Sequence, residues 1–167
     1  MSKNIIVKEA GKKGKGVFAL KDFKKDEFIL HIDGKVVETD KPSSYPKEIR
    51  DQWFPIGQIG NKRRYVFPKS PWKYLNHSCN PNAGIKNNRD IVAMKSIKKG
   101  EEIVFDYAMN NHEGIIDRWK MKCECGSKNC RKIIGTFDML DEKIKEKYLN
   151  YVIERIREQY KRHPKKD

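Results

Sequence analysis

Short runs of apolar residues, separated by turn-forming residues, recur from the N-terminus to about residue 105. The runs lie at 5–7, 17–20, 28–30, 36–37, 91–94 and 103–105. Gly, Asp and Lys residues interrupt them, as at Asp33-Gly34 and Lys99-Gly100. Apolar runs of this length with such boundaries are typical of short strands joined by tight turns. The pattern therefore predicts a mainly β fold for this part of the chain.

Beyond Leu140 the spacing of the apolar residues changes. They now recur three and four residues apart, with Lys, Arg and Glu between them, at Ile144, Tyr148, Leu149, Val152, Ile153, Ile156 and Tyr160. This spacing predicts one amphipathic helix of about five turns, followed by a frayed end from Lys161 to Asp167. We interpret the helix as a cover for the sheets, and a contact with a partner or a second copy is the alternative.

Two segments of the chain resemble each other. Residues 19–29 (ALKDFKKDEFI) and 93–103 (AMKSIKKGEEI) match at six of eleven positions. Two copies are too few for a solenoid, which needs at least three repeats. The similarity instead predicts two related strand-turn-strand units.

The composition places the chain among basic globular proteins of one domain. It has 167 residues, with 37 Lys and Arg against 23 Asp and Glu, and a net charge of +14. Residues 61–137 alone carry 16 basic and 7 acidic side chains. This excess is either a solvated face or a surface for nucleic acid. We see neither a membrane span nor a signal peptide and expect a soluble, intracellular protein, cytoplasmic if prokaryotic and possibly nuclear if eukaryotic.

The four cysteines form one candidate metal site. Cys123, Cys125 and Cys130 lie within eight residues, whereas Cys79 precedes them by more than forty. Four thiolates make a closed, tetrahedral zinc site of the structural kind. Disulfides are the rival interpretation, which an intracellular location disfavours, and unconnected free thiols are the third.

Two polar segments complete the candidate chemistry. Residues 74–82 read YLNHSCNPN, and residues 100–107 read GEEIVFDY. Asn and His offer donors and acceptors on both sides of a turn. Taken alone, the first segment is equally a hydrogen-bonded corner, and the tyrosine that ends the second is equally a core or rim residue.

Taken together and in this order, the segments resemble the SET-domain protein lysine methyltransferases that carry a cysteine-rich post-SET segment. Residues 76–82 are similar to the first signature of that family, 100–107 to the second, and 123–131 to the post-SET motif. Residues 13–19 (KGKGVFA) are similar to its N-terminal glycine turn. The resemblance covers roughly residues 4–135.

The resemblance implies a mainly β (β+α), β-clip-like SET fold of small sheets with a pseudoknot, to which the apolar spacing adds the C-terminal amphipathic helix. It divides the chain into a SET domain at 4–110, a post-SET zinc-binding segment at 111–137, and a C-terminal helix and tail at 138–167. The implied reaction is methyl transfer from S-adenosylmethionine to the ε-amine of a lysine in a protein substrate. The alternative is a basic, zinc-bearing SET-fold module without activity that binds chromatin, nucleoid or RNA.

The resemblance also assigns roles to residues. The cofactor would contact Lys13, Gly14, Lys15, Gly16, Asn76, His77 and Tyr107. Tyr107 would be catalytic, and Phe105 would line the lysine channel and permit di- or trimethylation. One structural zinc would be held by Cys79, Cys123, Cys125 and Cys130.

The chain departs from the family pattern at several positions. Lys73 stands where Arg is common, Ile32 where many members have Tyr, and Arg131-Lys132 where Arg-Gly is usual. One aromatic wall of the channel is thus unassigned, and residues 41–71, which would help to select the substrate, have no familiar counterpart. We expect a histone, histone-like or other basic protein as substrate, with nucleic acid as a possible further partner and no membrane. The oligomeric state stays open.

Overall fold

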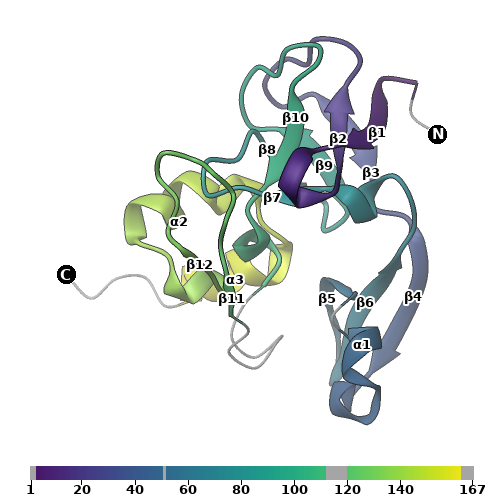
Figure 1. The fold of residues 1–167 in the computed structure, drawn as a ribbon. Helices are drawn as coiled ribbons and strands as arrows, with labels where there is room; N and C mark the ends of the chain where they lie inside the picture. The colour runs from purple at the N-terminus through teal and green to yellow at the C-terminus, as the bar shows by residue number, and fades with distance from the viewer. Residues whose placement is uncertain (1–2, 51, 112–119, 163–167) are drawn as a thin grey trace.

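The computed structural model describes residues 3–50, 52–111 and 120–162, and these form several small sheets with short helices (Figure 1). The first sheet has the order β1-β2-β10-β7. Its strands are β1 (Ile5–Glu9), β2 (Lys15–Ala19), β10 (Glu102–Phe105) and β7 (Asn76–His77). The mainly β prediction is therefore confirmed.

Three further sheets have the orders β3-β9-β8, β4-β6-β5 and β11-β12. Their strands are β3 (Phe28–His31), β4 (Gly34–Thr39), β5 (Phe54–Ile59), β6 (Lys62–Pro68), β8 (Ala83–Lys86), β9 (Asp90–Ala93), β11 (Met121–Lys122) and β12 (Ile133–Ile134). The helices are α1 (Lys47–Arg50), α2 (Glu142–Tyr148) and α3 (Glu154–Arg162). Short 3-10 turns lie between these elements, at η1 (Gly11–Lys13), η2 (Pro42–Ser44), η3 (Trp72–Tyr74), η4 (Tyr107–Met109), η5 (Phe137–Met139) and η6 (Leu149–Tyr151).

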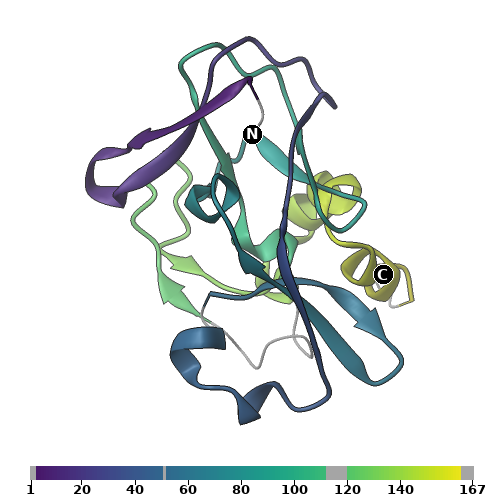
Figure 2. The same cartoon turned by 90° about the vertical axis from the view of Figure 1, so that its right-hand side faces the viewer.

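The unassigned segment at 41–71 forms most of a separate sheet. β6 pairs with both β4 and β5 in antiparallel register. Figures 1 and 2 show this sheet as an extension at the lower side of the molecule, with α1 beside it. The apolar runs predicted β4 but not β5 or β6, because basic residues break the apolar pattern of β6 at 62–64.

The two related segments pack against each other as a reciprocal pair. The Phe23 N–H donates to the Ile97 carbonyl at 2.8 Å, and the Ile97 N–H donates back to the Phe23 carbonyl at 3.0 Å. A second pair of equivalent hydrogen bonds lies on either side of this one. The Ala19 N–H donates to the Glu101 carbonyl, and the N–H of the equivalent residue Ala93 donates to the Glu27 carbonyl, both at 3.0 Å. The strand-turn-strand prediction is confirmed, and the two units lie about a local two-fold axis.

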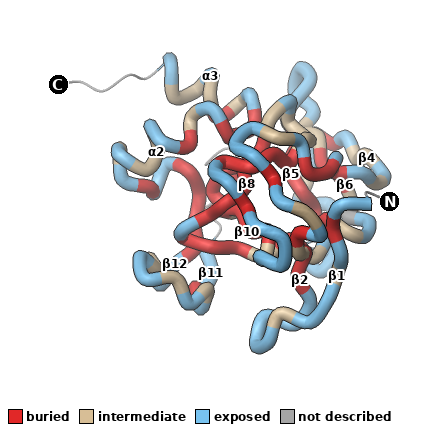
Figure 3. The backbone as a smooth tube through the Cα atoms, turned by 90° about the horizontal axis from the view of Figure 1, so that it is seen from above, coloured by how far each residue is buried: buried red, intermediate tan, exposed pale blue. Residues whose placement is uncertain are grey.

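The core lies between the sheets and the C-terminal helices. Figure 3 shows buried positions along β8 and β10, with exposed residues toward the tips of β1 and β2. Among the described residues, Val17, Ile85, Ile91, Ile103 and Met109 are fully buried. The C-terminal segment adds Tyr148, Val152, Ile153 and Ile156 to the same cluster. It therefore covers the core as predicted.

The prediction of one continuous C-terminal helix was wrong. The chain leaves the helix at Val152, whose φ of −116° and ψ of 162° are extended. There the Ile153 N–H donates to the Met109 carbonyl at 3.2 Å instead of continuing the helical ladder. Buried packing of the apolar residues at 152–153 thus overrides a spacing that is also compatible with one straight helix.

Side chains satisfy the backbone groups that the break exposes. Arg157 donates to the carbonyls of Leu149 and Val152, at 3.2 and 3.3 Å. Asn88, from the turn between β8 and β9, accepts from the Glu154 N–H at the start of α3 at 2.6 Å. Such partners replace the intrahelical bonds that helix ends lack. The predicted frayed end was wrong for Lys161 and Arg162, which belong to α3, and the rest of it, 163–167, lies outside the described residues.

Candidate active site and metal centre

The parallel pairing of β7 with β10 places the two signature segments side by side. Asn76 lies opposite Val104, and His77 lies opposite Phe105. The chain positions of these strands differ by almost thirty residues, so only the sheet register brings them together. This pairing is the frame on which the predicted site residues converge.

The glycine turn joins this frame through Asn76 and Glu102. Asn76 Nδ2 donates to the Lys15 carbonyl at 3.0 Å and to Glu102 Oε1 at 2.8 Å. Lys13 Nζ donates to Glu102 Oε2 at 2.6 Å. The sequence analysis missed Glu102, although it lies inside the second signature, because nothing in its local pattern indicates two side-chain partners, Lys13 and Asn76, that are so far away in the chain.

Two glycines shape the same turn. Gly14 has a φ of 72°, which is in the left-handed region that glycine adopts at little cost. A side chain at Gly16 would lie 2.7 Å from Glu102 Oε1 and 3.2 Å from Asn76 Nδ2. Glycine at position 16 therefore leaves the room that Glu102 and Asn76 occupy beside the turn.

His77 is buried between this turn and the cysteines. Its Nδ1 accepts from the Tyr107 N–H at 3.2 Å and lies 3.5 Å from Asp106 Oδ1. Its Nε2 lies 3.3 Å from Cys79 Sγ. Burial, aided by the charges of Arg131 and Lys13 and opposed by Asp106, lowers the pKa of His77 to about 4. The imidazole is therefore neutral near pH 7, which is the form that binds metals.

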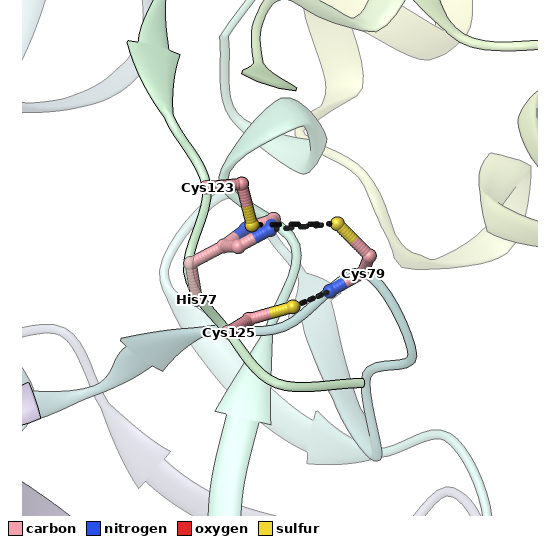
Figure 4. Close-up of side chains that lie close together, drawn as sticks. All are labelled: His77, Cys79, Cys123 and Cys125. Atoms are coloured by element: carbon pink, nitrogen blue, oxygen red, sulfur yellow. Dashed lines mark hydrogen bonds between the residues drawn. The ribbon is translucent and has the colours of Figure 1, made fainter. Parts of the chain in front are cut away.

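The cysteine cluster has the geometry of a metal centre (Figure 4). One ligand atom from each of His77, Cys79, Cys123 and Cys125 lies within 4.8 Å of the others. The Sγ atoms of Cys79 and Cys123 are 3.6 Å apart. Zn–S bonds of ~2.3 Å in a tetrahedron place sulfurs about 3.8 Å apart. The donor set therefore fits zinc.

The fourth predicted cysteine lies at the edge of this group. Cys130 packs against the same cluster, and its Sγ lies 3.6 Å from the Cys123 carbonyl. All four cysteines are free, so the disulfide interpretation does not hold in this structure. Three cysteines are thus brought together as predicted, with either Cys130 or His77 in reach as the fourth ligand.

Backbone N–H groups point at the sulfurs, as thiolates require. The N–H groups of Cys79 and Arg131 approach the Sγ atoms of Cys125 and Cys79 at 3.5 and 3.4 Å. Burial alone would raise the pKa of Cys125, but hydrogen bonds from Cys79 and Ser127 lower it to about 6. Burial raises the pKa of both Cys79 and Cys123. A divalent cation would displace those thiol protons.

Tyr107 begins η4 at the end of β10. Its hydroxyl donates to the Leu75 carbonyl at 3.0 Å, and its ring centroid lies 5.3 Å from that of His77 and 5.1 Å from that of Phe105. Burial raises the pKa of Tyr107 to about 12. The phenol therefore stays protonated throughout the physiological range.

A row of aromatic rings continues from Tyr107 into the extra sheet. The centroid of Phe105 lies 6.1 Å from Phe54, which lies 5.2 Å from Trp72. Ile32, by contrast, is fully buried. The 41–71 segment thus supplies Phe54 as an aromatic neighbour of Phe105, which the sequence analysis left unassigned.

Asp106 ties three parts of the chain together. It is fully buried, and its carboxylate pairs with Arg131 Nη2 at 2.7 and 2.9 Å. The Tyr148 hydroxyl donates to Oδ2 at 3.3 Å, and Oδ1 accepts from the Ala108 N–H at 3.1 Å. Asp106 therefore links the second signature to the cysteine-rich segment and to α2. Sequence reasoning missed Asp106 and Tyr148, because each reads locally as a cap or a core residue.

Comparison with known proteins agrees with this arrangement. The family model described as "SET domain" matches residues 14–108. The chain therefore belongs to the SET domain family. The predicted subdivision at 4–110, 111–137 and 138–167 stays a prediction, and residues 112–119 of its middle part lie outside the described residues.

Several curated relatives are histone-lysine methyltransferases. "Histone-lysine N-methyltransferase, H3 lysine-36 specific" of Candida glabrata is 33% identical over 144 residues, covering 79% of this chain and 20% of that protein. "Histone-lysine N-methyltransferase mes-4" of Caenorhabditis elegans is 30% identical, over 74% of this chain and 16% of the relative. Human "Histone-lysine N-methyltransferase 2D" is 27% identical, over 77% of this chain and 2% of the relative. The chain thus spans a fifth or less of these relatives.

Proposed function

We propose that the protein transfers a methyl group from S-adenosylmethionine to the ε-amine of a lysine in a protein substrate. The observation that carries the proposal is the convergence of Tyr107, Asn76 and the Lys13–Gly16 turn on the β7–β10 pair. Bound S-adenosylmethionine would supply an electrophilic methyl group on a cationic sulfonium. The substrate amine would accept this methyl group, and the methylated ammonium that results would release one proton to water.

The protein's main tasks in this reaction are positioning and keeping the amine neutral. A lysine has a pKa of ~10.4, so deprotonation at pH 7 costs about 4.6 kcal/mol. The aromatic row of Phe105 and Phe54 offers an apolar wall that disfavours the charged form. Near-attack geometry supplies several kcal/mol more. No carboxylate is needed as a general base.

The hydroxyl of Tyr107 is suited to orient the methyl group. Its proton is donated to the Leu75 carbonyl, and the backbone of His77 binds the phenol oxygen. A hydroxyl oxygen can accept through its lone pairs, which suits it to contact a positively polarised methyl group. Because the phenol stays neutral, it does not form an ion pair that would hold the sulfonium in its ground state.

We further propose one structural zinc in the cysteine cluster, with Cys79, Cys123 and Cys125 as common ligands and Cys130 as the fourth. The 3.6 Å separation of two sulfurs and the N–H groups aimed at them support this assignment. His77 is the competing fourth ligand. The metal would connect the first signature to the cysteine-rich segment.

The substrate is proposed to be a histone or another basic protein, because the relatives are named for histone lysines. Phe105 is proposed to permit di- or trimethylation. The nonenzymatic alternative is not favoured, since the catalytic tyrosine position and its neighbours are all present. An intracellular location stays a prediction, and no helix among the described residues has the length and apolar character to cross a membrane.

The proposal is tested by incubating zinc-replete protein with labelled S-adenosylmethionine and a lysate or purified histones. We expect label on lysine, located by mass spectrometry of the modified protein. A calorimetric titration with S-adenosylmethionine separates the alternatives, since a nonenzymatic module would release no heat. Absence of both cofactor binding and label would overturn the proposed function.

A further inference from the structure

A second polar cleft shares no residue with the candidate active site. Its volume is about 370 Å³, and it lies between the turn after β2, the β8–β9 hairpin and the break between α2 and α3. Lys25, Lys86 and Arg157 line it, together with the amides of Asn87 and Asn150. Among the described residues that line it, Asp26 is the one carboxylate. The cleft therefore carries an excess of positive charge.

The arginine of this cleft is held in place by the fold. Two of its N–H groups bind the carbonyls of Leu149 and Val152 at the break between the helices. A guanidinium has five N–H donors in a rigid fork, so the rest of the fork can meet a ligand. Little rotamer entropy is lost when such a fixed group binds an anion.

The negative groups of the cleft are already engaged. Asp26 Oδ1 accepts from Lys86 Nζ at 2.9 Å and from the Tyr151 hydroxyl at 2.8 Å. Glu154, at the start of α3, accepts from Asn88 Nδ2 at 3.3 Å. Asp26 therefore holds Lys86 in place but offsets its charge, so Arg157 and the exposed Lys25 supply the net positive charge of the cleft.

We propose that this cleft binds the phosphodiester backbone of a nucleic acid. Its cations and amides are the groups that bind phosphate oxygens, and a single phosphate would fill only part of its volume. Lys86 lies 5.6 Å above the Tyr151 ring and covers the aromatic face on which a base would stack. Contacts to the backbone, independent of base sequence, therefore fit the site better than recognition of bases.

The net charge of +14 favours a polyanion over a small phosphorylated partner. Long-range attraction grows with the charge on both molecules, and release of condensed counterions adds to affinity for DNA. A phosphopeptide would gain from the same cleft contacts but from neither of these effects. The cleft would thus be a binding site for DNA or RNA that is separate from the proposed methyl-transfer site.

The internal repeat provides a matched control for the experiment. Lys25 and Lys99 occupy equivalent positions of the two related turns, and both are exposed, but only Lys25 lines the cleft. Lys25→Glu and Lys99→Glu therefore change the net charge equally. Asn150→Asp is a second cleft variant, nearly isosteric and at an exposed position.

Binding to a fluorescein-labelled duplex of about 20 base pairs is measured by anisotropy at several salt concentrations, without S-adenosylmethionine. We expect a micromolar dissociation constant at about 50 mM salt, about fivefold weaker binding for Lys25→Glu than for Lys99→Glu, and a salt slope reduced by about 1. Asn150→Asp should weaken binding in the same direction.

Equal losses in Lys25→Glu and Lys99→Glu would mean that charge alone attracts DNA, and would overturn the cleft assignment. So would undetectable binding at low salt, or a phosphopeptide that binds more tightly than DNA in a competition. Inorganic phosphate that displaces the duplex at low millimolar concentration would indicate a small-anion site instead. None of these outcomes depends on methyl transfer, so they leave the proposed function unaffected.

Discussion

The Tyr107 hydroxyl is a single polar group placed where the reacting centre is proposed to lie. Tyr107→Phe removes its bond to the Leu75 carbonyl and the proposed contact with the methyl group while keeping the ring. We expect turnover to fall about 10²- to 10³-fold, or ~2.7 to 4 kcal/mol, by analogy with loss of an oxyanion donor. Affinity for S-adenosylmethionine, measured by calorimetry, should change little.

Tyr160→Phe is the control for that substitution, because Tyr160 binds Glu142 at the C-terminal helices, away from the proposed reacting centre. It should retain turnover close to that of the wild type. A Tyr107→Phe variant with the same turnover as this control would remove Tyr107 from the catalytic role.

Phe105 is proposed to line the space beside the substrate amine, next to Tyr107 and Phe54. Phe105→Tyr adds a hydroxyl whose bound water would compete with the second and third methyl groups. We expect the wild type to reach the di- or trimethyl state and the variant to stop earlier, as seen by intact-mass spectrometry over time. Phe28→Tyr, at a residue that is 54% exposed, is the control. A wild type that stops at one methyl group would contradict the prediction.

At the scale of elements, the cysteine-rich segment is attached to the sheets by two kinds of contact. One is the proposed metal. Cys130→Ser should abolish methyl transfer and zinc content while most of the strand signal remains in circular dichroism, because the sheets have their own core. Zinc is measured by elemental analysis of protein purified in reductant without chelator.

Full zinc content in Cys130→Ser would instead identify His77 as the fourth ligand. A wild-type protein that is fully active without zinc would contradict the metal assignment altogether. Cys130→Ser is informative because Cys130 lies at the edge of the cluster, whereas Cys79 and Cys123 are buried within it.

The second attachment is the buried pair of Asp106 and Arg131. Asp106→Asn leaves the guanidinium partly buried without its counter-charge, which costs about 3 to 5 kcal/mol for buried pairs. Tyr148→Phe removes only one hydrogen bond to the same carboxylate, worth ~0.5 to 1.5 kcal/mol. Urea unfolding should rank the two variants in this order. Equal effects would mean that the carboxylate does not organise the segment.

At the scale of the whole molecule, exposed ion pairs hold the related turns to their neighbours. Hydrogen bonds and charges from Lys98 and Lys86 lower the pKa values of Asp22 and Asp26, and those from Lys21 lower the pKa of Glu27. A lowered carboxyl pKa contributes stability that is present above the ordinary value of about 4 and is lost as pH falls through the folded value.

The free energy of unfolding should therefore decrease as pH falls below about 4, and the decrease should shrink in about 1 M salt, which screens exposed pairs. Thermal unfolding followed by circular dichroism between pH 3 and pH 7 measures this. The same profile for Asp22→Asn should be shallower, whereas an unchanged profile in the variant and at high salt would contradict the assignment.

The residues of the candidate site were largely predictable where they belong to short, contiguous motifs. Asn76, His77 and the Lys13–Gly16 turn stand in short motifs, and the structure brings them together around the β7–β10 pair. The cysteine spacing likewise predicted three members of one cluster. Glu102 and Asp106 were missed because their importance comes from partners that are distant in sequence.

By itself, the sequence determined the strand-rich class, the repeat and the candidate chemistry, because apolar period, turn residues and motif spacing are local properties. Only the tertiary structure decided the break at Val152, the extra sheet that carries Phe54, and the position of Arg157 in the cleft. Each depends on packing or hydrogen bonds between distant segments. In the C-terminal segment, such contacts outweigh a local preference of a few tenths of a kcal/mol per residue.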